Sequence, residues 1–441
     1  MIPGGSSVGN ALRGVPLNHR TPTFPAAVLI LVALVAQVAR SGQPAEPPRP
    51  ATGVAAAELA AFDRLVPALM EKWKLPGGSV AVARDGRLLA ARGYGLADVD
   101  TKRPVEPDAL FRIASLSKPI TAAAVLVLVE QGRLRLDSGA LDLLGPIEPP
   151  PGKSLDPRLS RVTVRQLLQH TAGFDRQASG DPMFRSIEIA RDLGVPPPAS
   201  PEAVVRWMLG RPLDFEPGGR YAYSNFGYCL LGRIVQRIAR QDYETAVQSL
   251  VLNPAGITRM RLGRSKAAGR LPGEVAYHVR PGAKPARSVF PDDREPVPPP
   301  YGTFFLESMD AHGGWVASAV DLVRFVTALD GTRKPGLLKP ETFALIAAPP
   351  TPQIDPKHPA RYGLGWALHP AGKGANWSHS GSLPGTMALM VRTHDGMTWA
   401  ALFNARPADS EALLLDLDRT LWEAIRQVTR WPKHDLFPRY R

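Results

Sequence analysis

Cysteine is almost absent from this chain of 441 residues, which contains only Cys229. A single cysteine excludes an internal disulfide and any cysteine-rich zinc or iron–sulfur centre. The nine histidines show neither a His-x-His nor a His-x-x-x-His spacing, the patterns typical of zinc hydrolases. Glycine patterns that cradle nucleotide phosphates are also missing. We therefore expect no metal ion and no organic cofactor.

Acidic residues are absent from residues 1–40, which contain three arginines and a largely apolar run of 14 residues, Ala26–Ala39. This run is shorter than the roughly 20 residues that a membrane-spanning helix needs. A positive start, a short apolar centre and small residues after it are typical of a secretory signal peptide. We expect export to the periplasm or the medium; an uncleaved anchor and an organelle transit peptide also fit this composition. Residues 41–53 are proline-rich and are expected to form a linker.

Dense runs of basic residues are missing as well, although the net charge is +13. The Lys and Arg residues are scattered, and no signature of a nucleic-acid-binding module occurs. We expect a basic protein without a nucleic-acid partner. Hydrophobic residues make up 44% of the chain and charged residues 21%, which is typical of a globular protein with a large core.

Strand and helix patterns are similar at the two ends of the domain. Residues 79–95 and 386–403 each contain two strand-like runs around an Asp-Gly pair, which favours a tight hairpin. Apolar residues at helical spacing predict a helix within 54–74 and another within 408–431. These patterns predict one antiparallel sheet that is built from both termini and covered by the terminal helices.

The middle of the chain is mostly helical. Helices are predicted near residues 119–131, 164–169, 201–210, 226–240 and 319–330, with proline-rich loops at 146–152, 196–201, 291–301 and 348–360. We expect an α+β fold over residues 54–441, with an α/β lobe (54–108 and 362–441) and a helical lobe (109–361). The site is expected in the crevice between the lobes.

The first chemical motif is Ser115-x-x-Lys118, which precedes a very apolar helix. Residues three apart share a helix face, so both side chains point the same way. A serine hydroxyl is a weak nucleophile until a base takes its proton, and a lysine serves as that base only when its pKa is depressed. About one or two Ser-x-x-Lys matches arise by chance in a chain of this length, so the motif needs support from other segments.

The second motif is Tyr223-Ser224-Asn225, directly before another apolar helix. Tyr223 is a candidate proton shuttle, and Asn225 is a candidate donor to Lys118 and to a substrate amide. Ser224 or Asn225 is also expected to cap the helix.

The third motif is His379-Ser380-Gly381-Ser382, on or beside a closing strand. A glycine in a strand lets another backbone approach closely. A substrate could extend the sheet along this edge, with the N–H groups of Ser382 and Ser115 as the two donors of an oxyanion hole.

The three motifs together resemble the serine β-lactamase and penicillin-binding-protein superfamily. The most similar branch is the class C-related group, which includes D-alanyl-D-alanine carboxypeptidases, family VIII esterases and D-amino-acid peptidases. The resemblance covers about residues 55–430 and includes the stretches LLQHTAGF (167–174), EPGGRYAYSNFGY (216–228), HGGWVASAVDLVRF (312–325) and YGLGW (362–366).

The resemblance implies that Ser115 is the acylated nucleophile and that Lys118 and Tyr223 together accept its proton. It implies that Asn225 positions the substrate and that His379, Ser380, Gly381 and Ser382 bind it. Many members have Lys-Thr-Gly where this chain has His-Ser-Gly, and a neutral histidine lacks the charge of a lysine.

This departure favours an esterase or peptidase that acts on small esters, amides or peptides. A cell-envelope carboxypeptidase or β-lactamase is the second hypothesis, and it would imply contact with the envelope. A non-catalytic scaffold that kept the fold is the third. The sequence predicts no oligomeric state.

Overall fold

The computed structural model describes residues 50–280 and 282–440. The predicted signal segment, residues 1–40, and most of the predicted linker lie outside the described residues. Within the described residues, no helix is long and apolar enough to cross a membrane.

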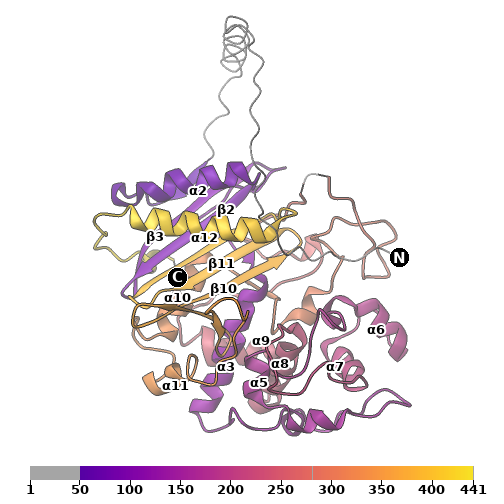
Figure 1. Ribbon diagram of the computed structural model, residues 1–441. Coiled ribbons are helices and arrows are strands. Elements are labelled where there is room, and N and C mark those ends of the chain that lie inside the picture. The colour runs from indigo at the N-terminus through magenta and orange to yellow at the C-terminus, as the bar shows by residue number, and fades with distance from the viewer. Residues whose placement is uncertain (1–49, 281, 441) are drawn as a thin grey trace, which may run out of the picture. The chain divides into compact units, whose positions relative to one another are not determined.

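Nine of the described strands form one antiparallel sheet, in the order β1-β3-β2-β12-β11-β10-β9-β8 with β4 beside β3, and three more form a small sheet, β5-β7-β6 (Figure 1). The strands are β1 (Ala51–Gly53), β2 (Gly77–Arg84), β3 (Arg87–Asp98), β4 (Arg103–Pro104), β5 (Phe111–Arg112), β6 (Arg261–Leu262), β7 (Trp315–Ala317), β8 (Arg361–Tyr362), β9 (Ala367–Ala371), β10 (Gly374–Leu383), β11 (Thr386–Arg392) and β12 (Met397–Phe403).

The two predicted hairpins, β2–β3 and β11–β12, join in the centre of the large sheet. Strand β12 pairs with β2 in antiparallel register from Met397 opposite Arg84 to Phe403 opposite Gly78. The sheet is therefore built from both ends of the domain, and the predicted α+β architecture is confirmed.

Both faces of this sheet are covered, because its side chains alternate between two apolar cores. Trp399, Ala401 and Phe403 of β12 pack into a core with α2 and α12. Ala400 and Leu402 of the same strand point to the opposite face and join the larger core. Figure 1 shows α2 and α12 side by side over one face of the sheet.

The helices follow the predicted positions in most of the chain. They are α2 (Ala60–Lys72), α3 (Ser117–Glu130), α4 (Ala140–Leu144), α5 (Val164–Leu168), α6 (Ser186–Leu193), α7 (Pro201–Leu209), α8 (Asn225–Ala239), α9 (Tyr243–Val247), α10 (Ala319–Leu329), α11 (Pro340–Ala344) and α12 (Ser410–Arg426). Short turns of helix are η1 (Ala57–Leu59), η2 (Ala114–Leu116), η3 (Pro157–Arg161), η4 (Pro182–Phe184), η5 (Gln248–Leu252), η6 (Ala267–Gly269), η7 (Leu306–Met309) and η8 (Phe437–Arg439).

Two boundaries of the predicted organisation were wrong. Residues 51–53, expected in the linker, form β1 and extend the sheet beside β3. Helix α10, expected in the helical lobe, packs against β2 and β12 instead. The reason is that the second face of the sheet is apolar and needs a covering layer, and every residue of α10 is buried.

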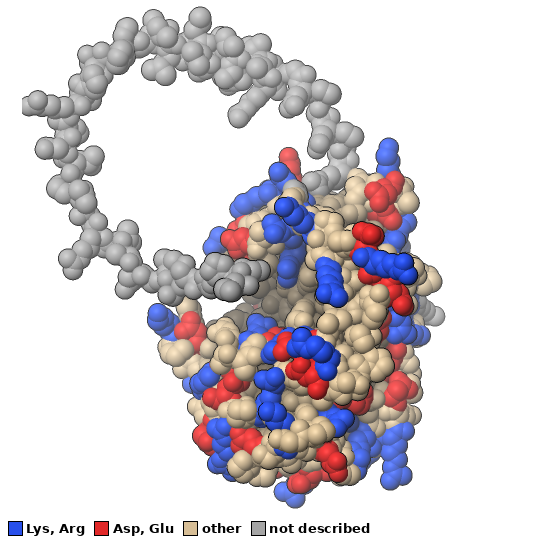
Figure 2. All heavy atoms as spheres, turned by 90° about the vertical axis from the view of Figure 1, so that its right-hand side faces the viewer, with Lys and Arg blue, Asp and Glu red and all other residues tan. Residues whose placement is uncertain are grey.

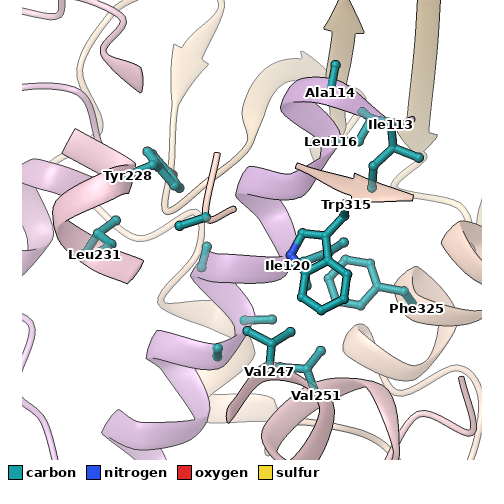
Figure 3. Close-up of a cluster of buried hydrophobic side chains, with 14 of the residues drawn as sticks. Ile113, Ala114, Leu116, Ile120, Tyr228, Leu231, Val247, Val251, Trp315 and Phe325 are labelled. Carbon is teal, nitrogen blue, oxygen red and sulfur yellow. The ribbon is translucent and has the colours of Figure 1, made fainter. Parts of the chain in front are cut away.

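Helix α3 lies in the middle of the larger core. Residues 117–128 are all buried, which explains why the sequence is apolar all round the helix. In Figure 3, Trp315 and Phe325 lie on one side of α3, and Tyr228 and Leu231 of α8 lie on the other. This packing holds the start of α3, with Ser115 just before it, in a fixed position.

Lys, Arg, Asp and Glu side chains are interspersed over the face shown in Figure 2. The net charge of +13 is therefore not gathered into one patch on this face.

Candidate active site

Ser115 lies in η2, immediately before α3. It is partly exposed, while every other residue from 111 to 120 is buried. The preceding Ala114 has φ +48°, a left-handed conformation that costs free energy for a residue with a Cβ. Strained backbone of this kind concentrates at functional sites, and here it adjoins the predicted nucleophile.

Lys118 is fully buried on the first turn of α3 and extends toward Ser115. Its Nζ lies 3.1 Å from Ser115 Oγ, 2.8 Å from Asn225 Oδ1 and 2.9 Å from the His312 carbonyl oxygen. Burial holds the pKa of Lys118 well below its usual range, although Asp181 opposes this shift. A buried ammonium without a contacting carboxylate is unfavourable, so the neutral amine is favoured.

The neutral Lys118 amine has two N–H bonds and one lone pair, and only one assignment of these to its three neighbours satisfies all of them. The Asn225 and His312 oxygens can only accept, so they take the two N–H bonds of the amine. The nitrogen lone pair then faces the Ser115 hydroxyl, which can donate its proton to it. Lys118 is thus placed and uncharged in the manner that a general base requires.

Tyr223 completes the group around the serine hydroxyl. Its side chain hydrogen-bonds to Ser115, and its ring centroid lies 4.7 Å from Lys118 Nζ. Burial raises the pKa of the Tyr223 phenol, so it remains protonated at neutral pH. The structure therefore brings the hydroxyl, the amine and the phenol together in one cleft.

Asn225 begins α8, where the Ser224 hydroxyl caps the helix by accepting from the N–H of Gly227. The Asn225 Nδ2 donates to Asp181 Oδ2 at 2.6 Å. The carboxylate fixes the orientation of the amide, so that its oxygen faces Lys118. The predicted donation from Asn225 to Lys118 was therefore wrong, because the amide N–H bonds to Asp181 and the amide oxygen accepts from the amine. One of the two amide N–H bonds is therefore used within the protein, and the second remains for a substrate.

His379 on β10 forms the opposite wall of the cleft. Its Nδ1 lies 2.8 Å from the Ser380 carbonyl oxygen, which can only accept, so this nitrogen carries the proton. Its Nε2 therefore accepts from the Tyr362 hydroxyl at 2.9 Å. Burial lowers the pKa of His379 to about 3, so the ring is neutral at pH 7. This strand offers no fixed positive charge at the position of the third motif.

Gly381 is required where β10 crosses the segment before the serine. A Cβ on this residue would lie 2.2 Å from the Ile113 carbonyl oxygen, well inside van der Waals contact. The absence of a side chain therefore lets β10 approach η2 closely.

The edge of β10 is open beside the serine. Strand β9 pairs with residues 374–378 of β10, and in the part of the chain that the structure describes no strand pairs with residues 379–383 on that side. Leu383 and Thr386 pair across a two-residue turn, and the direction of backbone bonding alternates along a hairpin strand. The N–H of Ser382 therefore points away from β11, toward the open edge.

Two hollows meet at Ser115. One has a volume of about 730 Å³ and lies along β10, with Tyr223 and His379 in its walls. The other has a volume of about 440 Å³ and includes Asn225 and Ser382. A substrate centred on Ser115 can thus place one part in each hollow.

Sequence reasoning missed two charged residues of the site, Arg176 and Asp181. The Arg176 guanidinium lies 4.6 Å from the Tyr223 ring centroid and lines both hollows. Both residues belong to the polar loop that follows the LLQHTAGF stretch. Charged residues are common in surface loops, so nothing local distinguished these two from solvated ones. Among the described residues, no group of three His, Cys, Asp or Glu side chains could hold a metal ion.

Comparison with known proteins places this geometry in a family. The model of the Beta-lactamase family matches residues 62–420. Penicillin-binding protein 4* of Bacillus subtilis (strain 168) is 28% identical over 341 residues, which cover 76% of this chain and 69% of that protein. Esterase EstB of Burkholderia gladioli is 34% identical over 220 residues, 47% of this chain and about half (51%) of that protein.

Solved structures have the same fold. The octameric penicillin-binding protein homologue from Pyrococcus abyssi aligns with a TM-score of 0.64 at 23% identity, over 83% of this chain and 77% of that one. The D-amino acid amidase from Ochrobactrum anthropi SV3 aligns with a TM-score of 0.64 at 22% identity, over 84% of this chain and 99% of that one. The family match spans most of the chain and includes all three motifs, and the fold agrees. The chain therefore belongs to the beta-lactamase family of serine hydrolases.

Proposed function

We propose that this protein hydrolyses small esters or amides through a covalent acyl-enzyme on Ser115. The observation that carries the proposal is the buried Lys118 amine, which lies 3.1 Å from the Ser115 hydroxyl oxygen and contacts no carboxylate among the described residues. A nucleophile with an uncharged amine at hydrogen-bond distance is the arrangement that nucleophilic catalysis needs.

In the first step, Ser115 Oγ forms a bond to the substrate carbonyl carbon while its proton moves to the Lys118 lone pair. The carbonyl oxygen gains negative charge, and the N–H groups of Ser115 and Ser382 are the donors we assign to it. The bond to the leaving group then breaks, and the leaving alcohol or amine takes a proton.

Tyr223 suits the delivery of that proton because its raised pKa keeps the phenol protonated. It can pass its proton to the leaving group and recover the proton that Lys118 accepted, because its side chain hydrogen-bonds to Ser115 and the Lys118 amine lies 3.1 Å from the same hydroxyl oxygen. Water then attacks the acyl-enzyme by the reverse sequence of transfers and releases the acid. Lys118 and Tyr223 thus act as a pair.

A fluorophosphonate probe tests the nucleophile directly. We expect covalent labelling of Ser115 alone, detected by peptide mass spectrometry, and none in Ser115→Ala. Ser160→Ala is the control, because this exposed hydroxyl bonds only to the Pro157 carbonyl oxygen. An unlabelled Ser115 in folded protein would contradict the proposal and favour a non-catalytic scaffold.

A carboxypeptidase of acyl-D-Ala-D-Ala peptides, or a β-lactamase, is the second candidate. Arg176 supports it, because this exposed guanidinium beside Tyr223 makes no ion pair among the described residues and could receive a substrate carboxylate. The test compares p-nitrophenyl esters, a chromogenic cephalosporin and an acyl-D-Ala-D-Ala peptide. Turnover of the esters alone would exclude this second candidate.

A further inference from the structure

The larger of the two hollows runs between α12 and one face of β10. Alternate residues of the strand line it: Asn376, Ser378, Ser380 and Ser382. Residues four apart on α12 line the other side: Leu414, Asp418 and Trp422. Leu414 also borders the smaller hollow together with Ser115, so this residue marks the end of the hollow near the nucleophile.

Asp418 lies away from the nucleophile along this hollow. It is one helical turn beyond Leu414, and it is close to His369, which pairs with the far part of β10. His369 Nε2 lies 2.9 Å from the Ser378 hydroxyl. Ser378 is three residues before Gly381, and three residues of a strand span roughly 10 Å. Gly381 in turn approaches the segment before Ser115 closely. A substrate arm of about this length would reach from Ser115 to Asp418.

The Asp418 carboxylate has no cationic partner among the described residues. Its one hydrogen-bonding partner is the side chain of Trp422, one turn further along α12. Partial desolvation lowers the pKa of the neighbouring His369 imidazole, against the opposing effect of Asp418, so the ring is mostly neutral at pH 7. Burial also raises the pKa of Asp418, which reports the cost of holding this carboxylate partly out of water without a counter-ion.

Apart from Arg176 and the polar side chains of β10, the walls between Ser115 and Asp418 are largely apolar. Leu389 and Val391 of β11 and Leu414 of α12 line this stretch, and the ring of Trp422 lies beside the carboxylate. Apolar walls favour a hydrocarbon segment. The indole of Trp422 donates its N–H to the Asp418 carboxylate, and a carboxylate at the end of an apolar hollow favours a cation through charge pairing.

We propose that the hollow between α12 and β10 binds an apolar arm of the substrate that ends in a cation such as an ammonium group, and that Asp418 binds this cation. This inference rests on the proposed function, because it describes the substrate of the same nucleophile. Arg176, at the nucleophile end of the hollow, repels a cation there. The charged end of the arm is therefore directed away from Ser115, toward Asp418.

Substrate pairs that differ only in one charge test the proposal. The acyl pair is the p-nitrophenyl ester of 6-(trimethylammonio)hexanoic acid and that of 7,7-dimethyloctanoic acid. The alcohol pair consists of acetate esters with the same two arms. Both pairs are needed because either half of the substrate can occupy this hollow.

We expect kcat/KM in one pair to favour the cationic member about tenfold, as for a partly desolvated charge pair. Asp418→Asn should bring this ratio close to one and leave kcat/KM for the neutral ester within about twofold. The matched control is Asp416→Asn, on the same helix, because the Asp416 carboxylate bonds to Lys72 and Trp73 instead of lining the hollow. An unchanged ratio in Asp418→Asn, or an equal loss in Asp416→Asn, would overturn the inference.

A binding measurement separates this inference from the proposed function. In Ser115→Ala, which cannot turn over, we expect hexyltrimethylammonium to bind by calorimetry and the added Asp418→Asn change to weaken it about tenfold. Equal affinity with and without Asp418 would contradict the subsite even if the esters are hydrolysed. Failure to hydrolyse the neutral esters, with binding intact, would contradict only the proposed function.

Discussion

Each of the two walls of the cleft buries a basic side chain and leaves it uncharged, but the consequences for the chemistry are opposite. On the helical wall, burial leaves Lys118 uncharged, and its lone pair becomes available to Ser115. On the strand wall, burial leaves His379 uncharged, and the cleft loses the positive charge that a lysine would supply there. The removal of water thus creates a base at one motif and removes an anion-binding charge at the other.

The two walls also differ in the kind of group that each contributes to the site. The helical wall holds Ser115, Lys118, Tyr223 and Asn225 in one connected hydrogen-bond group. The strand wall contributes mainly backbone groups along an open edge. Under the proposed function, acylation therefore depends on these side chains, whereas substrate choice depends on the hollows and their surrounding loops.

Removing the amine from the helical wall should give the largest effect. We expect Lys118→Ala to slow acylation about 10²–10⁴-fold, because Ser115 loses its proton acceptor. Single-turnover release of p-nitrophenol measures this rate. Lys118→Met, which keeps most of the side-chain volume, should lose as much. Acylation at the normal rate in both folded variants would transfer the role of base to Tyr223.

Separating the two walls should have the next largest effect. In Gly381→Ala, the new Cβ meets the Ile113 carbonyl oxygen, so β10 must move away from η2. We expect kcat/KM for esters to fall about 10²-fold, the cost of a displacement near 1 Å. Gly374→Ala on the same strand is the control, because its Cβ would approach only His394 Cβ, at 3.3 Å. Comparable activity in the two variants would contradict this account of the close approach.

The next prediction concerns a positive charge on the strand wall. His379→Lys would place a charged amine there, opposite the uncharged amine of Lys118. A lysine side chain is longer than that of histidine, so its ammonium can extend from the buried position of His379 into the adjoining hollow. There its ordinary pKa near 10.4 favours the charged form at pH 7. We expect His379→Lys to raise kcat/KM for an acyl-D-Ala-D-Ala peptide, relative to a neutral ester, about tenfold. The neutral variant His379→Gln should not change this ratio. The same ratio in all three proteins would show that the third motif does not select for carboxylates.

The last comparison concerns the free energy of unfolding as a function of pH and leaves activity aside. His379 has a folded pKa of about 3, below the ordinary value of about 6.5, so between these values the unfolded chain binds a proton that the folded chain does not. The stability from this group is complete above about pH 6.5 and decreases as the pH falls, by about 1.4 kcal/mol per pH unit. Urea unfolding at several pH values between 4 and 6.5 gives the slope of the unfolding free energy against pH. We expect this slope to be smaller in His379→Asn than in the wild-type protein, by the amount that corresponds to about one proton. An equal slope would mean that the ring is protonated in the folded protein.

Much of the fold could be predicted from the sequence because its signals are local. The Asp-Gly pairs at residues 85–86 and 395–396 lie between alternating apolar runs and form hairpins as predicted. The apolar run after Ser115 forms α3, and Ser224 caps α8. The three motifs were recognisable for the same reason, since each is a short pattern beside a helix or a strand. The position of α10 on the sheet was not predictable, because its apolar residues indicate that the helix is buried but not which surface it covers.

The sequence by itself determined the helices, the hairpins, the identity of the three motifs and the family. Only the tertiary structure decided that the Lys118 amine is uncharged, that His379 carries its proton on Nδ1, and that Asp181 orients Asn225. It also decided that Asp418 faces the same hollow as Ser115. Secondary structure follows from interactions between neighbours in the chain. Protonation and charge pairing instead depend on burial and on groups brought together from distant segments, which a linear pattern does not record.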